Sequence, residues 1–285
     1  TGIGVVKMLW LNFKDWFRTR NRQRVYNRLL NKPCSTHPDG FLFSGRNQMM
    51  EKGGYEPFEV DLVRKILGEV QLFANIGANH GFYSCLALST KTETVAYEPE
   101  ATNIKMIRKH IKANSFANSF TLHPCAVGSL ASEMVLHGGG SGGSLLSDNL
   151  SNAPKGEQQT VPVVTLDDTL SLGGKKALFL MDVEGFEYEA LKGSRTILSS
   201  ETKPYWIIEV WPQNGSGQPN NAFSNTFSFM ESHGYTYWGI DEATKNLTPL
   251  THGMVHKIEK GEAKVSFSNF LFIPEKDSLA LRLQP

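Results

Sequence analysis

The amino-acid sequence predicts one large α/β domain built on a mostly parallel sheet. Short apolar runs alternate with helix-forming stretches, which is the pattern of parallel strands connected by helices. A chain of 285 residues, 40% of them apolar, is long enough to bury one such core. No run in the sequence approaches the roughly 20 apolar residues that a membrane-spanning helix needs.

The N-terminal part of the chain differs in composition from the rest. We expect residues 1–45 to form a basic, largely helical segment with a turn-rich linker, and residues 46–285 to form the main domain. The net charge of the whole chain is only +1, so the basic residues near its start leave the remainder net acidic. We expect the segment to pack on the main domain; the alternative is a basic amphipathic helix on an anionic membrane surface.

The elements of the main domain follow from the pattern in order. A helix is predicted at 57–67 and another at 225–232, and a third follows the acidic motif at 187–198. Strands are predicted at 70–75, 94–98, 119–123, 177–183, 205–211, 235–240 and 269–273, with an additional strand at 161–164 assigned to an excursion from the sheet. The glycine run at 138–143 is predicted to be a surface loop, with a mobile lid as the alternative.

A glycine-containing turn lies between the first predicted strand and the helix after it. Gly77 and Gly81 flank this turn, and a strand, turn and helix in this order bring the backbone close to a nucleotide-like ligand. Glu98 ends the next apolar run, 17 residues after Gly81, which suits hydrogen bonding to ribose hydroxyls. Because the turn is not G-x-G-x-x-G, a single nucleoside is a better prediction than a dinucleotide.

The residues expected to bind this nucleoside-type cofactor lie around the turn and at the ends of the following strands. Cys125 and Ala126 follow the third predicted strand, at the edge that faces the base. The complete predicted set is Asn75, Gly77, Asn79, Gly81, Tyr83, Glu98, Cys125, Ala126 and Asp182.

Three acidic residues, Asp182, Glu184 and Glu209, are the candidates for catalysis. Asp182 and Glu209 each close an apolar run, so neighbouring parallel strands would bring them together at the carboxyl edge of the sheet. The alternative is that Asp182 or Glu184 caps the helix that follows. At a catalytic site, such carboxylates act as a general base or hold Mg²⁺ or Ca²⁺, and the sequence leaves both mechanisms open. No cluster of His and Cys indicates zinc.

Four segments resemble the FkbM-type S-adenosylmethionine-dependent methyltransferases: residues 75–84, 97–99, 165–168 and 181–187. The resemblance implies a Rossmann-like class I methyltransferase fold, with a seven-stranded, mostly parallel sheet and helices on both faces. It also implies that the chain uses S-adenosyl-L-methionine to methylate a hydroxyl of a sugar, a glycan or a small hydroxylated metabolite. Asn75 and Leu180 depart from the pattern, since the family usually has Asp and Lys at these positions.

Two other functions are weighed against this one. A nucleic-acid methyltransferase is suggested by the basic N-terminus, but the chain lacks an Asn/Asp-Pro-Pro-Tyr motif, so we expect no nucleic-acid partner. A cofactor-binding but inactive interaction module is suggested by Asn75 and Leu180. The three widely spaced cysteines, Cys34, Cys85 and Cys125, favour a reducing compartment, and we expect a cytoplasmic protein. The sequence leaves the oligomeric state open.

Overall fold

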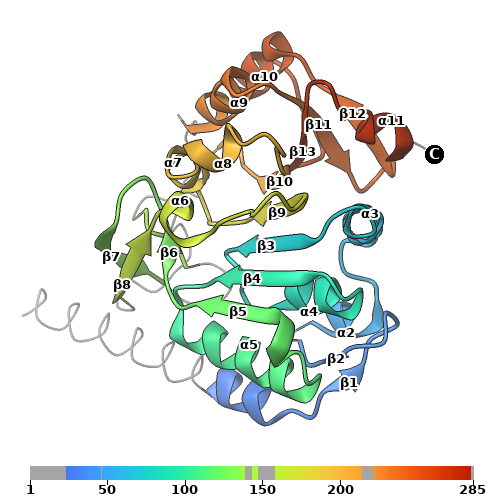
Figure 1. The fold of residues 1–285 in the computed structure, drawn as a ribbon, viewed down its shortest axis with the longest axis vertical. Coiled ribbons are helices and arrows are strands. Elements are labelled where there is room, and N and C mark those ends of the chain that lie inside the picture. Colours follow the sequence, from blue (N-terminus) through green and yellow to red (C-terminus); the bar gives the residue numbers. More distant parts are fainter. Residues whose placement is uncertain are drawn as a thin grey trace, which may run out of the picture.

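A computed structural model describes residues 24–45, 47–138, 143–146, 158–213, 220 and 222–283. Residues 1–23 and most of the predicted glycine-rich loop or lid lie outside the described residues. The described chain forms one eight-stranded sheet, a three-stranded sheet and a two-stranded hairpin, with helices around them (Figure 1). None of the helices that these residues form has the length and apolar character needed to cross a bilayer.

The central sheet confirms the predicted α/β class. Its strand order is β12-β11-β13-β10-β9-β3-β4-β5. The five strands from β10 to β5 run parallel, whereas β13 is antiparallel to both of its neighbours. Its strands are β3 (Leu72–Ile76), β4 (Glu93–Tyr97), β5 (Phe120–His123), β9 (Ala177–Met181), β10 (Tyr205–Glu209), β11 (Tyr235–Asp241), β12 (Asn246–Pro249) and β13 (Asn269–Pro274).

The predicted number of seven strands is one too few. The additional strand is β12, which pairs antiparallel with β11 at the edge of the sheet. Its four residues include only one buried side chain, Leu247, so they lack the apolar run by which the other strands were recognised. This segment is a strand because it pairs with β11 in a hairpin, and its own sequence lacks the hydrophobic pattern of a strand.

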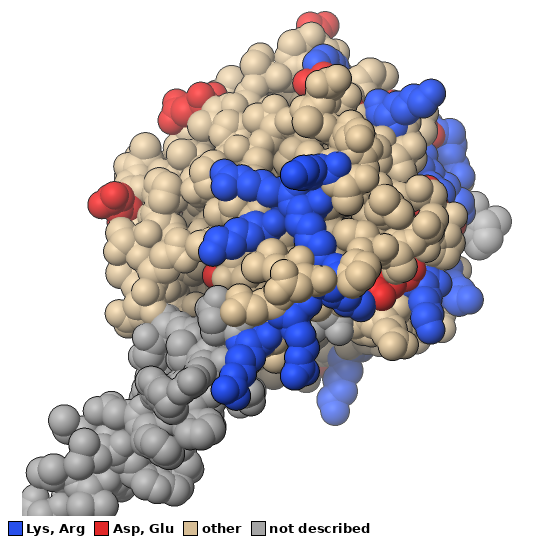
Figure 2. Space-filling model, turned by 90° about the horizontal axis from the view of Figure 1, so that it is seen from below, with Lys and Arg blue, Asp and Glu red and all other residues tan. Residues whose placement is uncertain are grey.

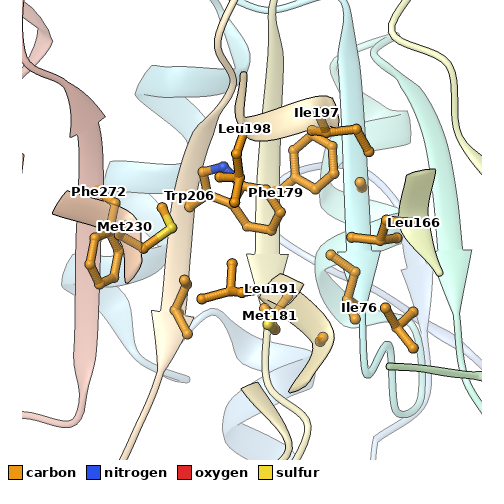
Figure 3. Packing of buried hydrophobic residues seen from close by; sticks show 14 of the residues in the cluster. Ile76, Leu166, Phe179, Met181, Leu191, Ile197, Leu198, Trp206, Met230 and Phe272 are labelled. Atoms are coloured by element: carbon orange, nitrogen blue, oxygen red, sulfur yellow. The ribbon is translucent and has the colours of Figure 1, made fainter. Parts of the chain in front are cut away.

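Helices cover both faces of the sheet because its strands are apolar on both sides. On β9, Phe179 and Met181 join one buried cluster, while Leu178 and Leu180 join another on the opposite face. Figure 3 shows the first cluster, in which Leu191 and Met230 pack against this face. The helices of that face are α6 (Leu166–Thr169), α7 (Glu187–Lys192), α8 (Arg195–Leu198), α9 (Ala222–Ser232) and α10 (His252–Glu259). The opposite face carries α3 (Pro57–Leu67), α4 (Phe82–Ser89), α5 (Ala101–Ala113) and α11 (Leu279–Leu283).

The predicted helix over 187–198 is wrong in one respect, because two short helices occupy this range. Gly193 separates α7 from α8. A Cβ atom at Gly193 would lie 2.1 Å from the carbonyl oxygen of Gly128, so the chain passes too close here for any side chain. Close approach to another segment therefore interrupts a sequence that otherwise favours one helix.

Two smaller sheets flank the central one. The predicted excursion is confirmed, since residues 161–164 belong to a separate sheet of order β6-β8-β7. Its strands are β6 (Ala126–Val127), β7 (Ser132–His137) and β8 (Gln158–Val164). The predicted linker contains a hairpin of β1 (Ser35–Thr36) and β2 (Leu42–Phe43), followed by helix α2 (Gln48–Lys52). The side chains of Phe41 and Phe43 in this hairpin are buried in the core, so the segment is more ordered than its turn residues indicate.

The described end of the basic N-terminal segment packs on the main domain. Residues 24–31 are helical. Tyr26 and Leu29 of this helix are buried against Met106 of α5, and Figure 1 shows the two helices side by side. The boundary at residue 45 remains a prediction.

The order of the strands locates the site. The chain adds β4 and β5 on one side of β3, and then β9 and β10 on the other side. Ile76 at the end of β3 pairs with Met181 at the end of β9, so Gly77 and Asp182 follow directly at this reversal. Ligands of open α/β sheets bind at such a switch point, beyond the carboxyl ends of the strands.

Candidate active site

The turn after β3 is held tightly between two neighbouring strands. The backbone N–H groups of Gly77 and Ala78 donate to the Tyr97 carbonyl at 2.9 and 3.0 Å, and the Asp182 N–H donates to the Ile76 carbonyl at 2.9 Å. Gly77 has φ +80°, and a Cβ atom there would lie 1.8 Å from the Asp182 carbonyl oxygen. Only glycine therefore fits at this position.

Two adjacent cavities open from this turn. Both are lined by Gly77, Asn79 and Asp182. The first also contains the predicted residues Glu98, Cys125, Ala126 and Glu184, and the second contains Asn75, Tyr83 and Glu209.

Gly81 lines neither cavity. It begins helix α4 with φ +81°, and a Cβ atom there would lie 3.2 Å from Cγ1 of Ile107. The structure thus brings Gly81 into the packing between α4 and α5 instead of placing it beside a ligand.

Glu98 is buried at the end of β4, and its carboxylate accepts three hydrogen bonds. The donors are the backbone N–H of Asn79 at 2.7 Å, the backbone N–H of Glu100 at 2.9 Å, and Nδ2 of Asn103 at 3.2 Å. Burial raises the pKa of Glu98 to about 7, although these donors act in the opposite direction. A carboxylate has about four acceptor positions, so Glu98 retains capacity for a further donor in the first cavity.

The remaining predicted walls of the first cavity are small and apolar. Cys125 and Ala126 are both buried. Burial raises the pKa of the Cys125 thiol to about 11, so it stays protonated at neutral pH. Phe186 adds an aromatic wall that the sequence analysis did not single out.

The second cavity contains two acidic residues that the predicted site set omits. The Tyr83 hydroxyl oxygen lies 3.0 Å from Oε2 of Glu56 and 2.8 Å from Oε1 of Glu59, and its single proton can be donated to either carboxylate. Burial raises the pKa of both carboxyl groups. Glu56 is the residue directly before α3 and Glu59 lies in its first turn, so the start of this helix brings both carboxyl groups to Tyr83.

Asp182 and Glu209 come together as predicted. The register of β9 and β10 pairs Met181 with Ile208, so the two acids follow at the same edge. Burial raises the pKa of Asp182 well above its ordinary value, and the nearby charges of Glu209 and Glu184 raise it further. Oε1 of Glu209 also accepts from Nε1 of Trp211 at 3.0 Å and from the Ser268 hydroxyl at 3.1 Å.

The alternative role as helix caps is wrong for Asp182 and Glu184. Helix α7 begins after Phe186 and has no side-chain cap. Glu184 is exposed, with φ +53°, and lines only the first cavity. The three acids therefore form one close pair and one residue at the rim.

The two departures from the family pattern both line the second cavity. Nδ2 of Asn75 donates to the Ser84 hydroxyl at 2.9 Å, which fixes the side chain in the buried strand end. Leu180 is buried in the apolar cluster of α3 and α4. Consequently neither position supplies a charge to this cavity.

Among the residues that the structure describes, no three His, Cys, Asp or Glu side chains are placed to hold one metal ion. Asp182 and Glu209 lie at the neighbouring ends of β9 and β10.

Comparisons with known proteins identify the family. The family model for the methyltransferase FkbM domain matches residues 75–237, more than half of the chain. A methyltransferase FkbM from Methylobacillus flagellatus KT has 16% identity and a TM-score of 0.44 over 88% of this chain, which spans 58% of that protein. The S-adenosylhomocysteine (SAH)-bound methyltransferase PaMTH1 of Podospora anserina has 12% identity and a TM-score of 0.39, covering 81% of each chain. No curated protein sequence matches. On the match of its family model, this chain belongs to the FkbM methyltransferase family.

Proposed function

We propose that the protein is an O-methyltransferase that uses S-adenosyl-L-methionine and acts on a hydroxyl of a sugar, a glycan or a small hydroxylated metabolite. The observation that carries this proposal is the meeting of Asp182 and Glu209 at the carboxyl ends of the paired strands β9 and β10, where both line the second cavity. Asp182 lies where a cavity suited to a nucleoside meets a second cavity rich in carboxyl groups.

The residues of both cavities fit the two halves of this cofactor. In the first, Glu98 would accept from the ribose hydroxyls, while Cys125 and Ala126 would contact the adenine. In the second, Glu56 and Glu59 would suit the ammonium group of the methionine part. Oδ1 of Asn79 and Oε2 of Glu59 are buried acceptors without a hydrogen-bond partner among the described residues, so each can take a donor from a ligand.

The cofactor, when bound, supplies an electrophilic methyl group on a sulfonium, so the protein's task is to bind, orient and deprotonate the acceptor. An acceptor hydroxyl is a poor nucleophile until it loses its proton. Asp182 lines both cavities with Glu209 beside it, so its carboxylate, when ionised, is placed to take that proton. Among the residues that the structure describes, no three carboxylates are placed to hold one cation, so this proposal assigns the role of base to the acid pair.

The test is a turnover assay that detects SAH release with a panel of mono- and oligosaccharides as acceptors. Asp182→Asn keeps the shape of the side chain but cannot accept the proton, so we expect a rate loss of about 10²–10⁴-fold. Cofactor affinity in calorimetric titration should stay near that of the parent. A chelator should leave the parental rate unchanged.

A matched control is Glu189→Gln on α7, whose carboxylate pairs with Lys192 and the Ser129 hydroxyl outside both cavities. This variant should turn over at the parental rate. Near-parental turnover by Asp182→Asn would refute the acid-pair mechanism. Turnover with an oligonucleotide alone would favour the nucleic-acid methyltransferase, and cofactor binding without turnover on any acceptor would favour the inactive module.

We also propose a cytoplasmic location. All three cysteines are free thiols, and Cys85 and Cys125 are buried away from any oxidant. Burial of unpaired thiols is usual for proteins of a reducing compartment.

A further inference from the structure

A basic face covers the side of the molecule that is formed by residues 24–31 and helix α5. Figure 2 shows Lys and Arg side chains gathered there, with few acidic side chains between them. Its exposed members on the two helices are Arg24, Arg28, Lys105, Arg108 and Lys112. On α5 their spacing of three and four residues places them in one stripe.

The packing of the two helices turns this charge outward. Tyr26 and Leu29 are buried against Met106, so the apolar sides of the helices face each other. Nζ of Lys109 lies between them and donates to the carbonyls of Leu29 at 2.8 Å and Lys32 at 2.6 Å. Lys109 is thus used to join the helices, and the other cations remain on the outer surface.

Among the described residues, these five cations have no acidic partner. Neither residues 24–31 nor α5 contains an Asp or Glu. Within the part of the chain that the structure describes, none of the five forms an ion pair, whereas the nearby Lys32 pairs with Glu51. A chain of net charge +1 therefore concentrates uncompensated positive charge on one face, and such a face attracts an anionic partner.

We infer that this basic face docks on an anionic membrane surface. Stable attachment to a bilayer generally needs two signals, and a polybasic surface is one of them. The second signal is an apolar anchor. The sequence before residue 24 has the composition of one, because large apolar residues are interspersed there with basic ones: Met8, Leu9, Trp10, Leu11, Phe13, Trp16 and Phe17. Trp and Phe are suited to the membrane interface, whereas binding of a nucleic-acid backbone needs only the cations.

This inference is independent of the methyltransferase proposal. None of the five cations lines either cavity. Membrane attachment would bring the enzyme to acceptors at the bilayer surface without changing the chemistry at Asp182.

The test is co-sedimentation of the full chain with vesicles of phosphatidylcholine alone and of phosphatidylcholine mixed with phosphatidylserine, at low and high salt. We expect binding only to the anionic vesicles, and weaker binding at high salt. The variant Lys105→Gln/Arg108→Gln/Lys112→Gln removes the stripe on α5. A basic side chain at an anionic surface contributes a factor of about five in affinity, so we expect a loss of roughly 100-fold.

The matched control is Lys257→Gln/Lys260→Gln/Lys264→Gln, which removes the same charge from exposed positions on and after α10. It should bind anionic vesicles as the parent does, and thermal unfolding should show that both variants are folded. The inference is overturned if the parental protein does not bind anionic vesicles, binds neutral vesicles equally well, or binds a duplex oligonucleotide but no vesicle. It is also overturned if the α5 variant retains parental affinity or if the α10 control loses as much.

Discussion

Glu98 shows how one side chain can serve both the fold and a ligand. Its carboxylate joins the turn after β3 to the start of α5 through Asn79 and Glu100, while it also lines the first cavity. A variant of Glu98 must therefore be compared with a variant of an equally buried glutamate that lines neither cavity. Glu187 is suitable, since burial also raises its pKa to about 7 and it lines neither cavity.

We predict that Glu98→Ala weakens binding of S-adenosylmethionine by about 1–3 kcal/mol, because the ribose hydroxyls lose their acceptor. Calorimetric titration measures this loss, and the same change is expected for SAH. Glu187→Ala should bind with nearly parental affinity. Equal affinities for the two variants would show that Glu98 has only a structural role.

The sequence predicts the candidate site well where a residue lies at the end of a strand. Glu98, Asp182 and Glu209 follow apolar runs, and parallel pairing brings such strand ends together without further information. Glu59 is different, because it reaches the site only through the packing of α3 against α4. Its hydrogen bond to Tyr83 spans 24 residues of sequence, a contact that no local pattern encodes.

At the scale of elements, local pattern predicts the central strands but not the segments that depend on a partner. Strands β3, β4 and β9 are buried along nearly their whole length, so their apolar runs are visible in the sequence. The β1–β2 hairpin and β12 are short, and pairing with a neighbouring segment stabilises them. The break between α7 and α8 also depends on contact with another segment, because its cause is the backbone of Gly128.

We therefore predict opposite effects for two Gly→Ala substitutions. Gly193→Ala should lower the free energy of unfolding by about 1–3 kcal/mol or more, since its Cβ must displace a backbone carbonyl. Gly253→Ala in α10 should be neutral or stabilising by at most about 1 kcal/mol, because a Cβ there has no atom within 4 Å. Urea unfolding of both variants is the measurement. Equal stabilities would contradict the proposed cause of the helix break.

At the scale of the whole molecule, buried acids link stability to pH. Burial raises the pKa of Glu98 and of Glu187 to about 7, well above the ordinary value of 4.5. Between these values the folded protein binds protons that the unfolded chain has released. Stability from these two groups is thus complete below about pH 4.5 and is lost as the pH rises through 7.

Buried histidines act in the opposite direction, but over a different range. Burial lowers the pKa of His110 from 6.5 to about 4, so its contribution increases with pH up to about 6.5 and then stays constant. The decrease caused by the acids is therefore clearest above pH 6.5. Burial also raises the pKa of Asp182 and Glu59, which adds to the decrease.

We predict that the free energy of unfolding falls by about 1–2 kcal/mol from pH 6.5 to pH 8.0 through Glu98 and Glu187 alone. Urea titrations at the two pH values measure the difference. The double variant Glu98→Gln/Glu187→Gln cannot release these protons, so its stability should change less over the same interval. A parental stability that rises with pH would show that neither acid is protonated in the folded protein. The cavity at the switch point would then hold a charged Glu98 throughout the neutral range.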